Sequence, residues 1–384
     1  GVEVNDEDIS DLVKTSLAEA GDTYNRLSDP KLMSLDTYSS HWVREKLREY
    51  FFRRTMKKVS PDSVDTLVKA LHGFLEIFPP RLQEEIGNEL FNEKSYEKKM
   101  VIWEEKNLPT DEIEKKFIDL VRVRNEKAKE RGFASFISQS LDQYQIPEAE
   151  YERFKASIDK VIRFCNRNLP YINKPAGFYS EFSHPCYLCE ISFPKIVYPG
   201  EVIKFVAGEY PILVELEDRI TIVPGDSPSI RYKKEDDRFE IKIGQKLNNR
   251  HKTIDLIHEL SHAIDQIEEY KNGVDPLQLG KFHEEKRNVE IELPLLKQLS
   301  PDVYRAYLAD ILLLIHRELF ELAVYENPDQ RLSRLYADLL NRCFSEAKQK
   351  DNPFYLFDKR IVLRPLSSLP QTVASVNMLA LQEE

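Results

Sequence analysis

The stretch DLIHELSHAIDQ, residues 255–266, places two histidines four residues apart, His258 and His262, with Glu259 directly after the first. On an α-helix, positions i and i+4 lie about 40° apart around the axis and roughly 6 Å apart along it. Isoleucines and leucines surround the motif, and residues 252–270 contain no proline or glycine. This pattern predicts a helix that points both imidazoles in the same direction.

Two imidazole nitrogens on one helical face can bind a single Zn²⁺ ion, and this spacing is the HExxH pattern of zinc hydrolases. Glu259 is rotated by about 100° from His258, so its carboxylate lies beside the ion, where it can act as general base. The alternative is two exposed histidines with an incidental glutamate. The predicted strand directly before this helix favours the metal site.

A hydrolytic zinc site needs a third protein ligand and one open position. A third histidine six residues after His262 is excluded, because position 268 is Glu268. We therefore expect a glutamate from a second helix within FHEEKRNVEIELPLLKQL, residues 282–299.

Glu290 is the predicted third ligand. It lies between Val289 and Ile291, in a stretch where an unpaired carboxylate would be costly to bury. The other acidic and imidazole side chains of the segment are ranked below it: Glu292 as the second choice, His283 as a weaker one, and Glu284 and Glu285 as solvated helix surface.

The pattern along the chain predicts a mainly α protein with one β-rich insert. Residues 1–170 have helical spacing, with helices expected from about Ser60 to before Pro79, from Asp111 to Arg131, and from Pro147 to Arg167. Between about residues 170 and 244, short β-rich runs predict a small antiparallel sheet: ISFPKIVYP, EVIKFVAG, PILVEL, RITIVP and RFEIKIG. We expect an N-terminal helical region, residues 1–109, and a catalytic region, residues 110–384, that together form one unit containing a cleft.

The last of these runs alternates apolar and polar residues, as an edge strand does. An edge strand can bind an extended peptide by adding its backbone to the sheet. The predicted substrate-binding residues are Arg238, Phe239, Glu240, Ile241, Lys242, Ile243 and Gly244.

Composition limits the class of protein. The 384-residue chain has a net charge of −11, which argues against nucleic acid as a partner. No stretch approaches the roughly 20 apolar residues that span a bilayer, and the acidic start has no apolar core typical of a signal peptide. Four cysteines are too few for a disulfide scaffold, so we expect a cytoplasmic protein, with secretion as the alternative. The single CxxC pair beside His184, Cys186 and Cys189, is interpreted as coincidental.

Three stretches resemble the oligoendopeptidase F and thimet oligopeptidase family of zinc peptidases. HELSHAID, residues 258–265, is similar to the family's HExGHxxH-type helix, and RNEKAKERGFASFISQSLDQY, residues 124–144, resembles an upstream family helix. VEIELP, residues 289–294, resembles the stretch whose glutamate is the third zinc ligand, which maps onto Glu290. The resemblance covers about residues 110–384. It implies helical halves around a deep cleft, a small sheet at its wall, and cleavage of short peptides.

The chain departs from the family in three respects. Ser261 replaces a usual glycine, and the chain is shorter than typical members. Residues 361–379 lack the tyrosines and histidine that stabilise the oxyanion in the family. Loss of one such donor typically costs about a hundredfold or more in rate. Tyr355, Tyr325 and Arg364 are the candidate replacements.

The sequence thus predicts a gluzincin-type metallopeptidase that uses one Zn²⁺ ion to hydrolyse internal bonds of short peptides. Two alternatives remain: a weakened or inactive relative that binds a peptide or protein partner, and a protease that acts on one folded protein. The sequence predicts no oligomeric state.

Overall fold

The computed structural model describes residues 61–382, apart from residues 94, 170–198, 214–219, 226–228, 234–237, 245–248, 272–279 and 346–348. The described chain forms two compact units. Unit 1 contains residues 61–139, 322–333 and 353–363, and unit 2 contains residues 140–321, 334–352 and 364–382. The chain passes between them within α7 (Phe136–Gln143), α12 (Pro301–Glu326) and α13 (Leu332–Cys343). The boundary expected at residue 109 stays a prediction.

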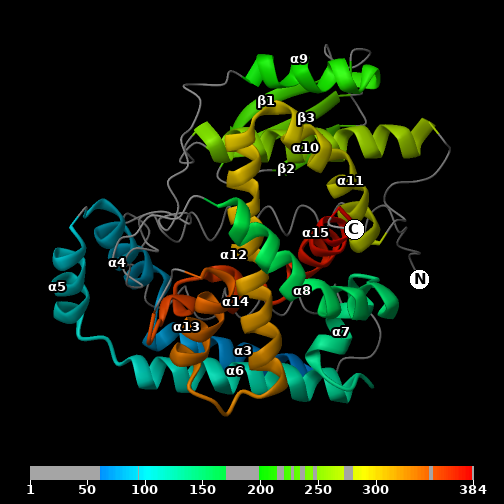
Figure 1. Cartoon of the computed structure of the whole chain (residues 1–384). Coiled ribbons are helices and arrows are strands. Elements are labelled where there is room, and N and C mark those ends of the chain that lie inside the picture. Colours follow the sequence, from blue (N-terminus) through cyan, green and yellow to red (C-terminus); the bar gives the residue numbers. More distant parts are fainter. Residues whose placement is uncertain are drawn as a thin grey trace. The chain divides into compact units, whose positions relative to one another are not determined.

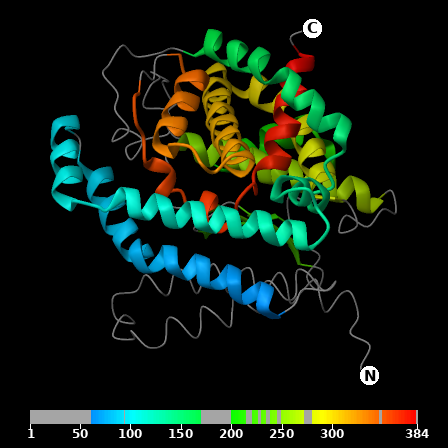
Figure 2. The same ribbon diagram turned by 90° about the horizontal axis from the view of Figure 1, so that it is seen from below.

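Unit 1 is helical. Figure 2 shows two of its helices, α3 (Pro61–Ile77) and α6 (Thr110–Glu130), packed side by side. Phe74 of α3 meets Phe117 of α6 edge to face, with ring centroids 6.3 Å apart, and both side chains are buried. Burial of each such ring contributes about 1.5–3 kcal/mol. The remaining elements of unit 1 are α4 (Pro80–Asn92), α5 (Tyr96–Lys106), η4 (Phe354–Leu356) and α14 (Lys359–Leu363).

Helix α6 ends where the sequence predicts. Gly132 has a φ of 88°, a left-handed conformation that suits glycine. The amide of Gly132 donates to the carbonyl of Lys129, and the amide of Phe133 donates to that of Ala128. These bonds satisfy carbonyls that the last helical turn leaves open. The helices predicted near residues 60, 111 and 147 are all confirmed, the last as α8 (Glu148–Asn168).

Unit 2 is built around α10 (Asn249–Lys271), which carries the HExxH motif. Figure 1 shows α10 below strands β1 and β3 and helix α9. Helix α10 packs against α9 (Pro199–Glu209), strands β2 and β3, and α11 (Lys281–Leu299). From residue 253 to 265 its side chains are buried on nearly every side. The motif therefore lies in the core of this unit, with several polar side chains buried beside the apolar ones. Helix α15 (Leu369–Leu381) packs against α8 and α11.

The sheet differs from the antiparallel one that the sequence predicts. Its strands are β1 (Ile220–Gly225), β2 (Ser229–Lys233) and β3 (Arg238–Gly244), in the order β1-β3-β2. Strand β3 pairs antiparallel with β2 but parallel with β1, so the sheet is mixed. Periodicity along single strands carries no information about the direction of their partners, which explains the error.

One predicted strand is a helix. The run EVIKFVAG lies within α9, whose first residue is Pro199. Val202 and Val206, four residues apart, are buried, whereas Glu201 and Lys204 are exposed. A short apolar run fits either period, and here the helical one is correct. The run ISFPKIVYP lies almost wholly outside the described residues, as do His184, Cys186 and Cys189.

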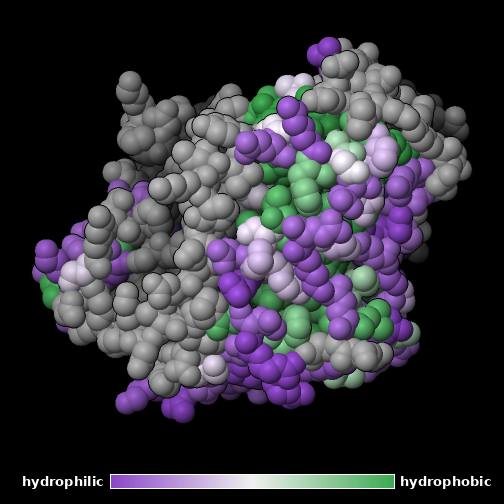
Figure 3. Space-filling view, turned by 45° about the horizontal axis from the view of Figure 1, so that its top comes forward, coloured by the Kyte–Doolittle hydropathy of each residue, from purple (hydrophilic) through white to green (hydrophobic). Residues whose placement is uncertain are grey.

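Among the coloured residues of the face in Figure 3, hydrophilic ones predominate, with smaller hydrophobic areas between them. Val101 and Leu381 are the large hydrophobic side chains that are exposed among the described residues. None of the described helices is long and apolar enough to cross a membrane.

Candidate metal centre

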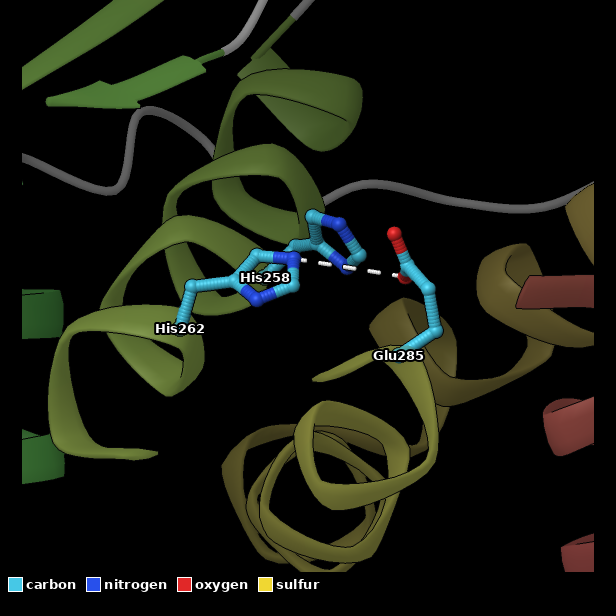
Figure 4. A group of neighbouring side chains, drawn as sticks. All are labelled: His258, His262 and Glu285. Carbon is cyan, nitrogen blue, oxygen red and sulfur yellow. Dashed lines mark ion pairs between the residues drawn. The ribbon is translucent and has the colours of Figure 1, made fainter. Parts of the chain in front are cut away.

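His258 and His262 lie on the same face of α10, one turn apart. Their ring centroids are 4.7 Å apart and the ring planes are nearly perpendicular, at 88°. Figure 4 shows both rings extending from α10 toward the neighbouring helix α11. The predicted helix and the shared direction of the two imidazoles are therefore confirmed.

The α11 residue that can complete a metal site with both histidines is Glu285. One ligand atom from each of His258, His262 and Glu285 lies within 4.8 Å of the others. Glu285 Oε2 is 4.0 Å from His262 Nε2, which is too long for a hydrogen bond (Figure 4). This oxygen is buried and has no hydrogen-bond partner among the described residues. Buried polar atoms are normally satisfied, so the open acceptor fits a position that a cation would fill.

Lys281 fixes the orientation of the Glu285 carboxylate. Lys281 Nζ lies 2.8 Å from Glu285 Oε1 and 3.0 Å from Glu284 Oε2, one turn of α11 away. With Oε1 held by the ammonium group, Oε2 is the oxygen directed at the histidines. The Glu285 carboxylate is thereby arranged to offer a single oxygen.

Two of the three groups hold the protonation state that a metal ligand needs. Burial and the neighbouring His258 lower the pKa of His262 to about 3, so its imidazole is neutral. Burial favours a neutral Glu285, but Lys281 and the two histidines outweigh it and hold the pKa of Glu285 below its ordinary value. A neutral imidazole and a carboxylate are the forms that bind zinc.

His258 is different because of a carboxylate behind it. Its Nδ1 is 2.9 Å from Glu292 Oε2. Burial would lower the pKa of His258, but Glu292, helped by Glu285 and Glu259, raises it to about 10. A metal at this site would therefore displace a proton from His258.

Glu259 is buried on α10 beside His258. Burial raises the pKa of Glu259 to about 7, although the charge of His258 acts in the opposite direction. A carboxyl group that exchanges its proton near neutral pH suits general acid–base chemistry. The position and the pKa both fit the role that the sequence predicts for Glu259.

The structure does not bring Glu290 to the histidines. Its carboxylate is partly exposed and pairs with Arg287 Nη1 at 2.9 Å. Five residues separate Glu285 from Glu290, a rotation of about 140° around the helix. The flanking Val289 and Ile291 are buried, but neighbours in a helix point in directions about 100° apart, so they do not bury Glu290.

The interpretation of Glu285 as solvated surface is wrong, because this residue is only 7 % exposed. Of the other candidates, Glu292 lies behind His258 with both oxygens bonded, and His283 is exposed on α11. A helical stripe was the signal available in the sequence. Glu285, Asn288 and Glu292 are spaced at i, i+3 and i+7, and this stripe faces α10.

The expectation of an edge strand at residues 238–244 is also wrong. Strand β3 is central: residues 239–244 pair with β1 and residues 238–242 pair with β2. A central strand has no free edge to which a peptide backbone can add. The outer strands of the described sheet are β1 and β2.

Two candidate replacements for the oxyanion donor are already engaged within unit 1. The hydroxyl of Tyr355 donates to Glu114, and that of Tyr325 accepts from Arg124 Nη1 at 3.0 Å. Both tyrosines are buried. Arg364, the third candidate, is exposed in unit 2.

The described fold is similar to two solved peptidase structures. One, assigned as an oligoendopeptidase F, matches with a TM-score of 0.54 and 14% identity over 94% of this chain and 73% of that chain. The chain has the fold of an oligoendopeptidase F. PZ peptidase A, solved with an inhibitor, matches with a TM-score of 0.53 and 16% identity over the same shares of the two chains. No protein-family model matches the sequence, and no curated protein matches it.

The oligoendopeptidase resemblance is therefore confirmed at the level of the fold. The mainly helical class with a small sheet near the HExxH helix is also confirmed. The match extends over 94% of the chain, whereas the sequence motifs indicate a likeness only over about residues 110–384. Motifs mark the parts of a fold that carry chemistry, and the N-terminal helices have none.

Proposed function

We propose that this protein is a zinc-dependent metallopeptidase that hydrolyses internal bonds of short peptides, with one zinc ion held by His258, His262 and Glu285. The observation that carries the proposal is the convergence of these three ligand atoms, within 4.8 Å, from two packed helices. Three protein ligands with one remaining position are the ligand set of a hydrolytic zinc site. The oligoendopeptidase fold supports the choice of a peptide as the substrate.

Separate residues of the chain have separate roles in the proposed hydrolysis. A bound zinc ion would supply a Lewis acid that lowers the pKa of water to about 7. Glu259 accepts the proton of the attacking water and later returns it to the leaving amine. Its pKa of about 7 allows both transfers near neutral pH. Glu292 holds the His258 ring in place through its Nδ1 atom.

Substitution of Glu259 by Gln tests the assignment of the base. The amide keeps the size of the side chain but cannot accept the proton, so we expect peptide hydrolysis to fall by about 10²–10⁴-fold. Zinc content should be unchanged, since Glu259 is not a ligand. Cleavage of a quenched fluorescent peptide library and metal analysis measure the two properties.

Glu269→Gln, on the same helix and away from the three ligands, is the matched control and should keep its activity. If Glu259→Gln cleaves peptides as fast as the parent protein, the proposed mechanism is wrong. If Glu259→Gln loses zinc together with activity, Glu259 supports the metal and its role as base is not established by the loss.

A second candidate function is peptide or protein binding by an inactive relative. It is favoured by one observation: residues 361–379 contain no tyrosine or histidine, and the hydroxyls of Tyr325 and Tyr355 are bonded elsewhere. Stoichiometric zinc without cleavage, across peptides and intact proteins, would select this function. Cleavage of one intact protein alone would instead select a protease with a folded substrate.

A further inference from the structure

We propose that Tyr307 is a positioning residue that sets the zinc affinity of His258 through Glu292. This inference rests on the zinc site proposed above. The hydroxyl of Tyr307 donates to Glu292 Oε1 at 2.8 Å, and Glu292 Oε2 lies 2.9 Å from His258 Nδ1. The three side chains form a continuous line of hydrogen bonds from α12 through α11 to α10.

Because Glu292 is buried, its carboxylate depends on the Tyr307 hydroxyl as a hydrogen-bond donor. Glu292 is fully buried and Tyr307 is almost so. A carboxyl group without access to water must bond both oxygens to the protein. His258 satisfies one oxygen and Tyr307 satisfies the other, so removal of the hydroxyl would leave Oε1 without its donor and free the carboxyl group to rotate.

The position of Glu292 determines which nitrogen His258 offers. A proton on Nδ1 that is donated to Glu292 leaves the lone pair of the neutral ring on Nε2. The Asn288 amide fits this tautomer when its oxygen, and not its nitrogen, faces His258 Nδ1. Its nitrogen is placed 2.7 Å from His258 Nδ1, whereas its oxygen is buried without a partner among the described residues. Exchange of the amide nitrogen and oxygen, which are nearly equal in size, would make Asn288 a second acceptor of the same proton.

Residues that hold a histidine ligand from behind strongly affect metal binding. Loss of a direct outer partner typically weakens metal affinity by about 10–100-fold. Glu292 is such a direct partner of His258. Tyr307 acts one bond further out, so its effect should be at the lower end of that range. Helix α12, which supplies no ligand, would thereby influence the metal site.

The test is the zinc dissociation constant of Tyr307→Phe, measured by competition with a chelating dye. We expect zinc binding to weaken by about tenfold, and Glu292→Gln to weaken it by about 10–100-fold. Tyr304→Phe is the matched control, since it lies one turn away on α12. Its hydroxyl is buried with no hydrogen-bond partner in the described part of the chain, so this variant should bind zinc like the parent.

A double variant separates positioning from a general structural effect. If Tyr307 acts through Glu292, Tyr307→Phe should weaken zinc binding no further in a protein that already carries Glu292→Gln. Full additivity would overturn the proposal, as would a Tyr307→Phe protein that binds zinc with the parent's affinity. Failure of the parent protein to bind zinc would instead contradict the proposed zinc site itself. Thermal unfolding of each metal-free variant confirms that it is folded.

Discussion

Glu150, in the first turn of α8, joins three helices that support the candidate metal centre. Its carboxylate accepts from Lys286 Nζ of α11 at 2.9 Å and from Asn377 Nδ2 of α15 at 2.8 Å. Arg153 lies 3.3 Å away. Burial would raise the pKa of Glu150, but Lys286, Arg153 and Asn377 outweigh it, and the pKa lies below its ordinary value of 4.5.

The depressed pKa predicts a loss of stability in acid. The group binds protons more weakly when folded, so its contribution is fully present above pH 4.5 and is lost as the pH falls through the lower folded pKa. Lys286→Met should reduce the difference in free energy of unfolding between pH 7 and pH 3, by at most about 1 kcal/mol because the pair is partly exposed. Urea unfolding at the two pH values measures it.

Lys155→Met is the control, because Lys155 pairs with the exposed Glu152 on the outer face of α8. This variant should leave the acid dependence as it is in the parent. An equal loss in both variants would show that Glu150 does not couple the helices in the proposed way.

At the candidate site, the residues that could be predicted from the sequence are those whose roles depend on their spacing along one helix. His258, Glu259 and His262 follow from positions along one helix, which sequence spacing determines. Glu285 depends on which face of a second helix meets the first, and this is set by packing across residues far apart in sequence. Likewise, the partnership of Tyr307 with Glu292 joins two helices and leaves no pattern in the sequence.

At the scale of elements, the start of α11 determines where Glu285 lies. The amide of Phe282 donates to the carbonyl of Tyr144 at 3.1 Å, which fixes α11 to the turn after α7. Gly280 caps the helix beside this turn. A Cβ atom built on Gly280 would lie 2.8 Å from Cβ and Cδ of Gln145, closer than such atoms normally approach. The close contact explains why glycine is suitable at this position.

Gly280→Ala should therefore displace the start of α11, which carries Lys281 in its first turn and Glu285 one turn later. We expect the free energy of unfolding to fall by about 1–3 kcal/mol, as for other overpacked positions. We also expect weaker zinc binding. Denaturant unfolding and dye competition measure the two effects.

Gly208→Ala, in α9, is the contrasting variant. An added Cβ there meets nothing within 4 Å among the described residues, and alanine in a helix is about 0.5–1 kcal/mol more favourable than glycine. It should be neutral or stabilising. If Gly280→Ala is equally well tolerated, the contact with Gln145 does not fix the start of α11.

Long helices could be predicted from the helical spacing of their apolar residues, whereas short elements could not. The spacing in α3, α6 and α8 gave correct helices, and the RITIVP and RFEIKIG runs gave correct strands. The sequence does not indicate strand β2, and it predicts a strand where α9 lies, because the short run EVIKFVAG fits both periods. The central place of β3 depends on the order of strands, which no single strand encodes.

At the scale of the whole molecule, the candidate centre belongs to one unit. Helices α10 and α11 both lie within unit 2, as do Tyr307 of α12 and the sheet. The interior position of α10 keeps His262 and Glu259 largely away from water. There, burial shifts the pKa of His262 down and that of Glu259 up. The packing that stabilises unit 2 thus also sets the pKa values of His262 and Glu259, which the proposed reaction uses.

The central claim is that His258, His262 and Glu285 hold one zinc ion. Metal analysis by mass spectrometry on the purified parent protein, Glu285→Gln and Glu290→Gln tests it most directly, since the two variants make the same change five residues apart on α11. We expect about one zinc per chain in the parent and in Glu290→Gln, and less than about a tenth of that in Glu285→Gln. Zinc retained in Glu285→Gln but lost in Glu290→Gln, or a parent protein that binds no zinc, would contradict the claim.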